Sequence, residues 1–171
     1  MNVHILIFDI ICLISDKLNI QDKLNFIQIN KHINDTNKIK DFSNLSNNIN
    51  LTQNILYKYE HIEKLELIPS YHIKNINFLT NLKILYAEYK CMIGDNDIKD
   101  LNLKELYING NQKITTINHM INLEILHAAD DSGLNDDGIK NLNLMKLYAS
   151  SNPKITSINH MSNLQILYAS F

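Results

Sequence analysis

The chain repeats itself along most of its length. Three segments align at an offset of 41 residues, namely HIKNINFLTNLKILYA (72–87), KITTINHMINLEILHA (113–128) and KITSINHMSNLQILYA (154–169). The stretch 98–114 matches 139–155 at the same offset. Self-similarity at a fixed period is typical of stacked structural units rather than of one closed core. We therefore expect an α/β solenoid, and because stacked arrays usually serve as binding surfaces, we look for a partner before a reaction.

The 41-residue period divides into two alternating units. A phrase of the form L-x-x-L recurs at steps of 20 or 21 residues, beginning at Ile62 (a degenerate copy), Leu82, Leu103, Leu123, Leu144 and Leu164. Alternation within the phrase predicts a short strand, and the following I-x-x-I-x-x-[ML] spacing predicts a tight helical turn on the far side of the coil. One unit buries about six apolar side chains at ~1.5–3 kcal/mol each but orders roughly twenty residues at ~1–2 kcal/mol each, so only stacked units are stable.

Two stretches carry a resemblance to a known family. The phrase LKELYINGNQKITTINHM (103–120) and the tail LNDDGIKNL (134–142) resemble the leucine-rich repeat. The resemblance covers residues 62–171, about five and a half units of 20–21 residues. It implies a solenoid with parallel strands on its concave face.

The resemblance also implies a buried polar column. In the family, an Asn of each coil bonds to backbone groups of neighbouring coils, because its amide both donates and accepts. Eight residues after the phrase starts stand Asn111, Asp131 and Asn152. Lys90 and Ser70 occupy the same slot in other units, so we expect the column to be incomplete and the packing looser there.

Residues 1–42 do not follow the repeat and are predicted to form a helical module, with 43–61 as the linker and entry to the solenoid. The stretch LIFDIICLISDKLNIQDKLNFIQINKHIND (6–35) is similar to the F-box, through Asp9-Ile10-Ile11 at its start and Ile29-Asn30-Lys31 at its end. It lacks the Pro and the Trp that are usual in that family.

The F-box resemblance implies that the module docks a Skp-type linker protein of a cullin-type ubiquitin ligase, while the repeats bind the target. The expected adaptor-binding side chains follow helical spacing and are Phe8, Ile11, Ile14, Leu18, Leu24 and Ile29. The alternative is a plain leucine-rich-repeat binding module whose N-terminal helices only cap the solenoid, since an uncovered end exposes apolar side chains. The two interpretations are compatible.

The residues that flank the buried pair of each strand are expected to point outward on the concave side. The middle column is aromatic, and its predicted target-binding residues are Tyr86, Tyr107, His127, Tyr148 and Tyr168. Tyrosine supplies a large contact area at low entropic cost, so this column predicts a protein-recognition strip. The alternative is cross-strand stacking that only stabilises the sheet. Such a column can both bind a partner and stabilise the sheet.

Composition excludes other partner classes. The net charge of −2 gives no basic footprint for nucleic acid. The apolar run 5–14 is too short to span a bilayer, and the unpatterned Cys12 and Cys91 fit a reducing compartment. His119 and His160 recur at equivalent repeat positions, which favours structure over catalysis. We therefore expect no enzyme activity, no cofactor and no metal.

The chain is rich in Ile, Asn and Lys and contains no Arg, as AT-rich genomes tend to encode. Together with the F-box-like module and the short repeats, this composition resembles the F-box and repeat proteins of giant DNA viruses of amoebae. That resemblance implies a viral protein that acts in the host cytoplasm and redirects ubiquitination.

Overall fold

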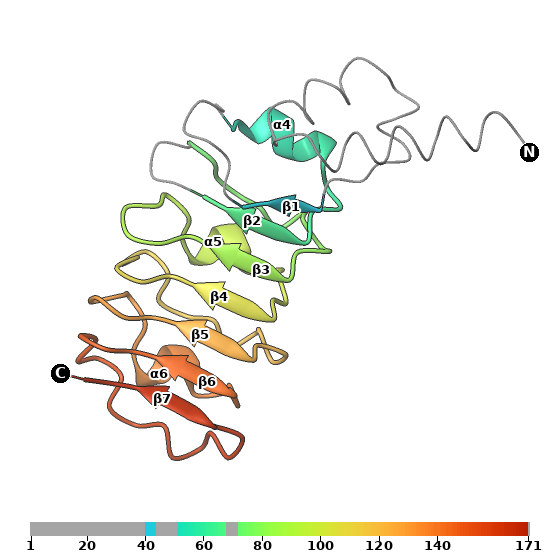
Figure 1. Ribbon diagram of the computed structural model, residues 1–171. Helices are drawn as coiled ribbons and strands as arrows, with labels where there is room; N and C mark the ends of the chain where they lie inside the picture. The colour runs from blue at the N-terminus through green and yellow to red at the C-terminus, as the bar shows by residue number, and fades with distance from the viewer. Residues whose placement is uncertain (1–39, 44–50, 68–71, 171) are drawn as a thin grey trace, which may run out of the picture.

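A computed structural model describes residues 40–43, 51–67 and 72–170, which form one parallel sheet of seven strands in sequence order (Figure 1). The strands are β1 (Asp41–Phe42), β2 (Lys64–Glu66), β3 (Ile84–Tyr86), β4 (Glu105–Tyr107), β5 (Ile125–His127), β6 (Lys146–Tyr148) and β7 (Ile166–Tyr168). From β2 onward each strand belongs to one sequence unit. The predicted stacking of the units is thus confirmed, and the arrangement is consistent with a repeat solenoid.

The register of the sheet keeps the leucines of successive phrases together. Leu85 pairs with Leu65 on one side and Leu106 on the other, and the same pairing continues through Leu126 to Leu147. All five are fully buried. Because side chains alternate across a strand, their neighbours on both sides point to the opposite face. Each of the strands β2 to β6 therefore places one leucine in the core and two side chains on the open face. We define the open face as the face of the sheet away from the short helices.

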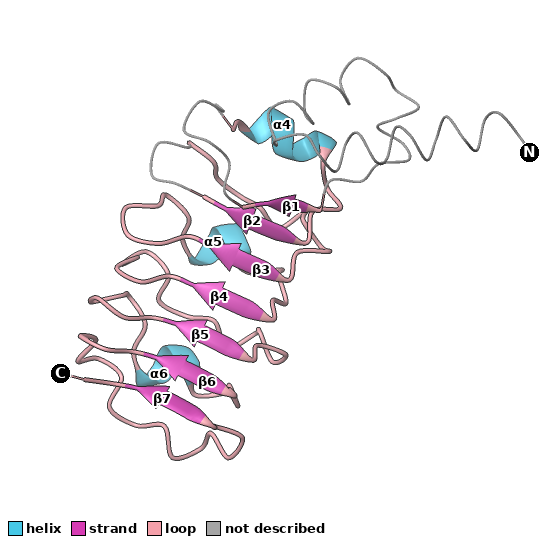
Figure 2. Cartoon of the chain, viewed as in Figure 1, coloured by secondary structure: helices cyan, strands magenta, loops and turns pink. Residues whose placement is uncertain are grey.

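Among the described residues, three short helices accompany the sheet, α4 (Gln53–Lys58), α5 (Asp95–Ile98) and α6 (Asp136–Ile139). Figure 2 shows α5 and α6 behind the strands, on the face opposite the open one. Both lie in the 21-residue units, not in the I-x-x-I-x-x-[ML] segments where we predicted a helical turn. In the segment 114–123 the amides of Met120 and Leu123 bond to the carbonyls three residues earlier, Ile117 and Met120. Those are separate turns, because no run of consecutive bonds joins them into a helix.

The buried polar column differs from the prediction in the 21-residue units. Asn111 and Asn152 are fully buried as expected, but Asp131 is exposed and Ser132 is buried in its place. Likewise Lys90 is exposed and Cys91 is buried. The extra residue of these units precedes the buried position and shifts it by one. Residue 70, the other position where we expected the column to be interrupted, lies outside the described residues.

Left-handed backbone recurs at the end of the strand loop in both kinds of unit. The φ angle is +50° at Tyr89, +63° at Gly110 and +58° at Ser151, which are equivalent positions in three of the units. In the unit of β5 two consecutive residues, Asp130 and Asp131, take φ angles of +56° and +57°. Asp tolerates this region better than most side chains, so the longer loop turns without strain on a bulky residue there.

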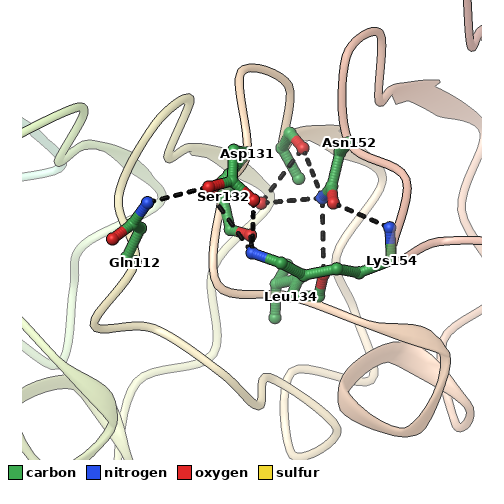
Figure 3. A network of polar contacts seen from close by, with 7 residues as sticks. Gln112, Asp131, Ser132, Leu134, Asn152 and Lys154 are labelled. Atoms are coloured by element: carbon green, nitrogen blue, oxygen red, sulfur yellow. Dashed lines mark hydrogen bonds and ion pairs between the residues drawn. The ribbon is translucent and has the colours of Figure 1, made fainter. Parts of the chain in front are cut away.

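Asn152 is the centre of the best-connected polar group in the core (Figure 3). Its amide nitrogen donates to the Ala128 carbonyl at 2.9 Å, to the Ser132 hydroxyl at 3.0 Å and to the Leu134 carbonyl at 3.3 Å. The Ser132 hydroxyl donates in turn to the Ala128 carbonyl at 3.0 Å. Asn111 repeats the pattern one period earlier, because it donates to the carbonyls of Ala87 and Ile93. Ser and Asn together thus satisfy backbone groups that the bend turns inward.

The N-terminal edge of the sheet is covered. Phe42 of β1 and Leu56 of α4 are fully buried, and Tyr59 packs on Phe42 with ring centroids 5.2 Å apart. At the other edge, β7 leaves Leu167 47 % exposed. In the parts of the chain that the structure describes, no helix is long and apolar enough to cross a membrane.

Candidate functional site

Five aromatic side chains form one continuous stack along the open face, and we call them the aromatic column. Its members, one from each of β3 to β7, are Tyr86, Tyr107, His127, Tyr148 and Tyr168. Successive ring centroids lie 4.2, 4.4, 3.9 and 5.0 Å apart, with interplanar angles of 14°, 25°, 11° and 9°. Adjacent strands are spaced by about 4.8 Å, which suits stacked rings. The structure therefore brings together every residue of the predicted target-binding strip.

Because the rings stack face to face, the column presents ring edges to solvent rather than ring faces. Tyr107, His127 and Tyr148 each have a ring on both sides, and all three are part-buried. Tyr168 at the end of the column is 58 % exposed. The cross-strand stacking named as the alternative is thus present. It does not oppose a recognition role, because side chains already fixed by stacking lose little entropy when a partner binds.

His127 replaces tyrosine in the middle of the column. Its ring lies 3.9 Å from that of Tyr148 and 4.4 Å from that of Tyr107. Burial between the two rings disfavours the charged imidazolium and lowers the pKa of His127, although the Glu105 carboxylate partly opposes this. His127 is therefore held in its neutral, stacking form.

The lowered pKa predicts a pH-dependent stability that a His127→Tyr variant should reduce. The unfolded chain binds a proton at His127 more readily than the folded chain does. The contribution of His127 to the free energy of unfolding is therefore fully present above the ordinary histidine pKa of about 6.5, and it is lost as the pH falls through the lower pKa of the folded state. Urea unfolding of both proteins at several pH values between about 5 and 7.5 measures this. We expect the wild-type protein to lose more stability toward acid than the variant, and equal losses would contradict the assignment.

Aliphatic and charged side chains flank the column on one side. In strand order from β2 to β7 this flank contains Lys64, Ile84, Glu105, Ile125, Lys146 and Ile166. The Tyr107 hydroxyl donates to the Glu105 carboxylate at 2.9 Å. Burial and this carboxylate together raise the pKa of Tyr107, so its hydroxyl stays protonated and remains a donor.

On the other flank, a ladder of polar groups runs across β3, β4 and β5. The Asn109 amide donates to the Glu88 carboxylate at 2.7 Å and accepts from the Ala129 backbone N–H at 2.9 Å. Glu88 is half-buried, and burial raises the pKa of its carboxyl, with the neighbouring carboxylates of Glu66 and Asp130 adding to the effect. The Asn109 bond lowers the pKa in part.

Two residues of the open face were missed by the sequence analysis. Glu66 of β2 is in register with Tyr86 and thus stands at the head of the aromatic column. Lys64 lies with its ammonium 5.6 Å from the centroid of the Tyr86 ring, within the range of a cation–π contact. The signal was present, because the phrase at Ile62 has the same spacing as the others. Both residues were missed because their unit carries charges where the later units carry aromatic and aliphatic side chains.

Polar side chains on the helical side of the coils accept hydrogen bonds from the backbone of the next coil. The Asp95 carboxylate accepts from the Thr115 N–H at 2.7 Å, and Asp136 accepts from the Thr156 N–H at 2.7 Å. Their repeat positions are equivalent. Among the described residues, no three His, Cys, Asp or Glu side chains gather as metal ligands.

The two equivalent histidines also contact the preceding coil. His119 approaches the Ile98 carbonyl with its Nε2 at 3.1 Å, and His160 approaches the Ile139 carbonyl at 3.3 Å. The same contact thus recurs at an interval of 41 residues. This is the structural role that their equivalent positions favoured.

Comparison with known proteins does not name a family. The chain matches no protein-family model, no curated protein and no solved structure. The six predicted adaptor-binding residues, Phe8, Ile11, Ile14, Leu18, Leu24 and Ile29, lie outside the described residues. The candidate site is therefore the open face of the sheet.

Proposed function

We propose that this protein recognises another protein through the open face of its solenoid. The observation that carries the proposal is the aromatic column, in which five rings from five consecutive strands stack in register on the open face of the sheet. Aromatic residues contribute strongly to protein interfaces, and parallel stacked strands hold these rings in a fixed arrangement. The aliphatic flank (Ile84, Ile125 and Ile166) enlarges the apolar contact area.

The two sequence resemblances support a more specific proposal. The leucine-rich-repeat resemblance of 62–171 fits a target-binding solenoid, and the F-box resemblance of 6–35 fits a docking module. We propose that the chain is a substrate-recognition adaptor of a cullin-type ubiquitin ligase. In this role Phe8, Ile11 and Leu18 contact a Skp-type linker protein, the aromatic column binds the target, and the transfer chemistry occurs on other subunits. The compositional resemblance supports the further proposal that this activity takes place in the cytoplasm of a virus-infected host.

A second candidate function is a plain binding module without a ligase. In it the N-terminal helices only cap the solenoid. One observation favours it: Phe42, Leu56 and Tyr59 are buried at the N-terminal end of the sheet, as expected of an apolar end that the chain itself covers. In that case the N-terminal helices need no partner. Target binding through the aromatic column is common to both candidates.

Affinity purification of three tagged proteins separates the two candidates. The wild-type chain is expected to retain both a recombinant Skp-type protein and a target, and an Ile11→Asp/Leu18→Asp variant only the target. A Tyr107→Ser/Tyr148→Ser variant should retain only the Skp-type protein. Removing two stacked tyrosines takes away apolar contact area, and we expect at least a tenfold loss of target binding. Circular dichroism checks that each variant keeps its fold.

Two outcomes would contradict the proposal. A wild-type chain that is folded but does not retain the Skp-type protein excludes the adaptor role and leaves the plain binding module. Equal target capture by the wild-type chain and the tyrosine variant excludes the aromatic column as the recognition surface.

A further inference from the structure

Charge is unevenly distributed over the open face. Three carboxylates, Glu66, Glu88 and Glu105, lie around the Tyr86 and Tyr107 rings at the β2–β4 end. From β5 to β7, Lys146 is the charged residue of the face. His127 is titratable, but its lowered pKa keeps it neutral. The face therefore has an acidic half and a nearly neutral half.

Two of these carboxylates, Glu88 and Glu105, accept hydrogen bonds from neutral groups. The Lys64 ammonium lies 3.8 Å from the Asp41 carboxylate at the edge of the sheet, and it also approaches the Tyr86 ring. Glu88 accepts from the neutral amide of Asn109, while Glu66 and Asp130 are the charged groups that act on it. Glu105 accepts from the neutral hydroxyl of Tyr107. A cation placed over this half would thus meet two carboxylates, Glu88 and Glu105, that are held by neutral groups.

The floor between these carboxylates is apolar and rigid. Glu105 and Glu88 stand on opposite sides of the stacked Tyr86 and Tyr107 rings, whose centroids are 4.2 Å apart. Ile84 and Ile125 lie next to Glu105 in its column. A bound chain on this half thus meets ring edges and aliphatic side chains beneath it and a carboxylate on each side. The long stems of lysine and arginine suit such a surface, because they pack on apolar groups while the head reaches a charge.

We propose that the acidic β2–β4 half of the open face binds an extended, lysine- or arginine-bearing segment of the target protein. This inference rests on the proposed function and adds to it the chemistry of the partner. Charge complementarity selects the basic segment over an acidic one, and the same carboxylates repel the phosphates of a nucleic acid. The aromatic column supplies the contact area, and the carboxylates set the partner's charge and orientation.

Peptide binding to the full chain tests the inference. Three labelled dodecapeptides share an alanine and leucine background and carry lysine, glutamine or glutamate at every third position. By fluorescence anisotropy we expect the lysine peptide to bind about tenfold more tightly than the glutamate peptide, and raising the salt from about 50 to about 300 mM should reduce this preference. A Glu88→Gln/Glu105→Gln variant should lose most of the preference. The matched control is Glu60→Gln, because Glu60 is an exposed carboxylate outside the sheet.

The outcomes separate this inference from the proposed function. Equal binding of the three peptides, no binding of the lysine peptide, or an unchanged preference in Glu88→Gln/Glu105→Gln would overturn the inference. If target capture still depends on Tyr107 and Tyr148 in that case, the proposed function stands without it. If the lysine preference is present and is lost in Glu88→Gln/Glu105→Gln but not in Glu60→Gln, the inference is supported.

Discussion

Replacing Asn152 by alanine is expected to lower the free energy of unfolding by about 3 kcal/mol. The amide of Asn152 is fully buried and donates to two carbonyls and one hydroxyl, those of Ala128, Leu134 and Ser132. Alanine supplies no donor, so the Leu134 carbonyl loses the side-chain donor that reaches it across the bend. The Oδ1 atom of Asn152 also accepts a hydrogen bond from the Lys154 N–H at 3.3 Å, and that bond is lost as well. Leaving such groups unpaired in the interior costs more than the net value of the bonds.

Chemical denaturation followed by circular dichroism measures this effect, with Asn159→Ala as the matched control. Asn159 lies in the same unit and is exposed, so its replacement should change the stability by less than about 0.5 kcal/mol. In a stacked array the loss can appear as early unfolding of the coils around β6 and β7, which hydrogen exchange would detect. An Asn152→Ala protein as stable as Asn159→Ala would show that the buried amide does not hold the coils together.

The spacing of apolar residues was sufficient to predict most of the fold. The buried sets of the 20-residue units lie where the period placed them, for example Leu103, Leu106 and Ile108 at 0 % exposure. In the 21-residue units, Ile93 and Leu134 lie 41 residues apart in the sequence, and both are fully buried. A core position is recognisable from sequence because every unit must bury it against the next, so it recurs with the period.

The position of the extra residue in the longer units could not be predicted in the same way. Counting from the phrase start pointed to Asp131, whereas Ser132 is buried. The shift occurs in both longer units, although two consecutive residues, Asp130 and Asp131, adopt left-handed backbone in one of them and Tyr89 alone does so in the other. Phrase spacing reports the length of a unit but does not show where a loop takes up an added residue. A small polar residue next to an acidic pair was the available signal.

The aromatic column could be predicted as a set but its geometry could not. Alternation along each strand placed Tyr107 and Tyr148 on one face, and the parallel register then made them neighbours of His127. Whether rings in such a column stack face to face or project outward depends on side-chain rotamers, which a sequence pattern does not fix. Face-to-face stacking changes the expected interface, because partners meet ring edges and hydroxyl groups instead of flat aromatic surfaces.

Replacing Gly138 by alanine is expected to destabilise the protein by about 3 kcal/mol or more, as forced overpacking does. A Cβ atom at Gly138 would lie 2.2 Å from the backbone oxygen of Thr115 in the preceding coil. That oxygen cannot rotate away by itself, because the neighbouring Ile117 N–H donates to the Gly138 carbonyl at 3.0 Å and ties the two coils together. The cause is space and not backbone conformation, since Gly138 does not adopt a positive φ. The alanine must therefore push the α6 turn away from its neighbour.

The equivalent residue one period earlier shows why this tightness is local. Asp97 carries a side chain there, and in the coil it faces, Asn75 takes a left-handed φ of +52°, so the backbone follows another path. Gly94→Ala is the matched control, because a Cβ at Gly94 would lie 3.2 Å from its nearest atom, the Lys113 carbonyl oxygen, a contact that a small shift relieves. Thermal and urea unfolding should therefore show that the Gly138→Ala protein is much less stable than both the Gly94→Ala protein and the wild-type protein. If the two variants were equally stable, the close approach of α6 to the preceding coil would not be a constraint on this fold.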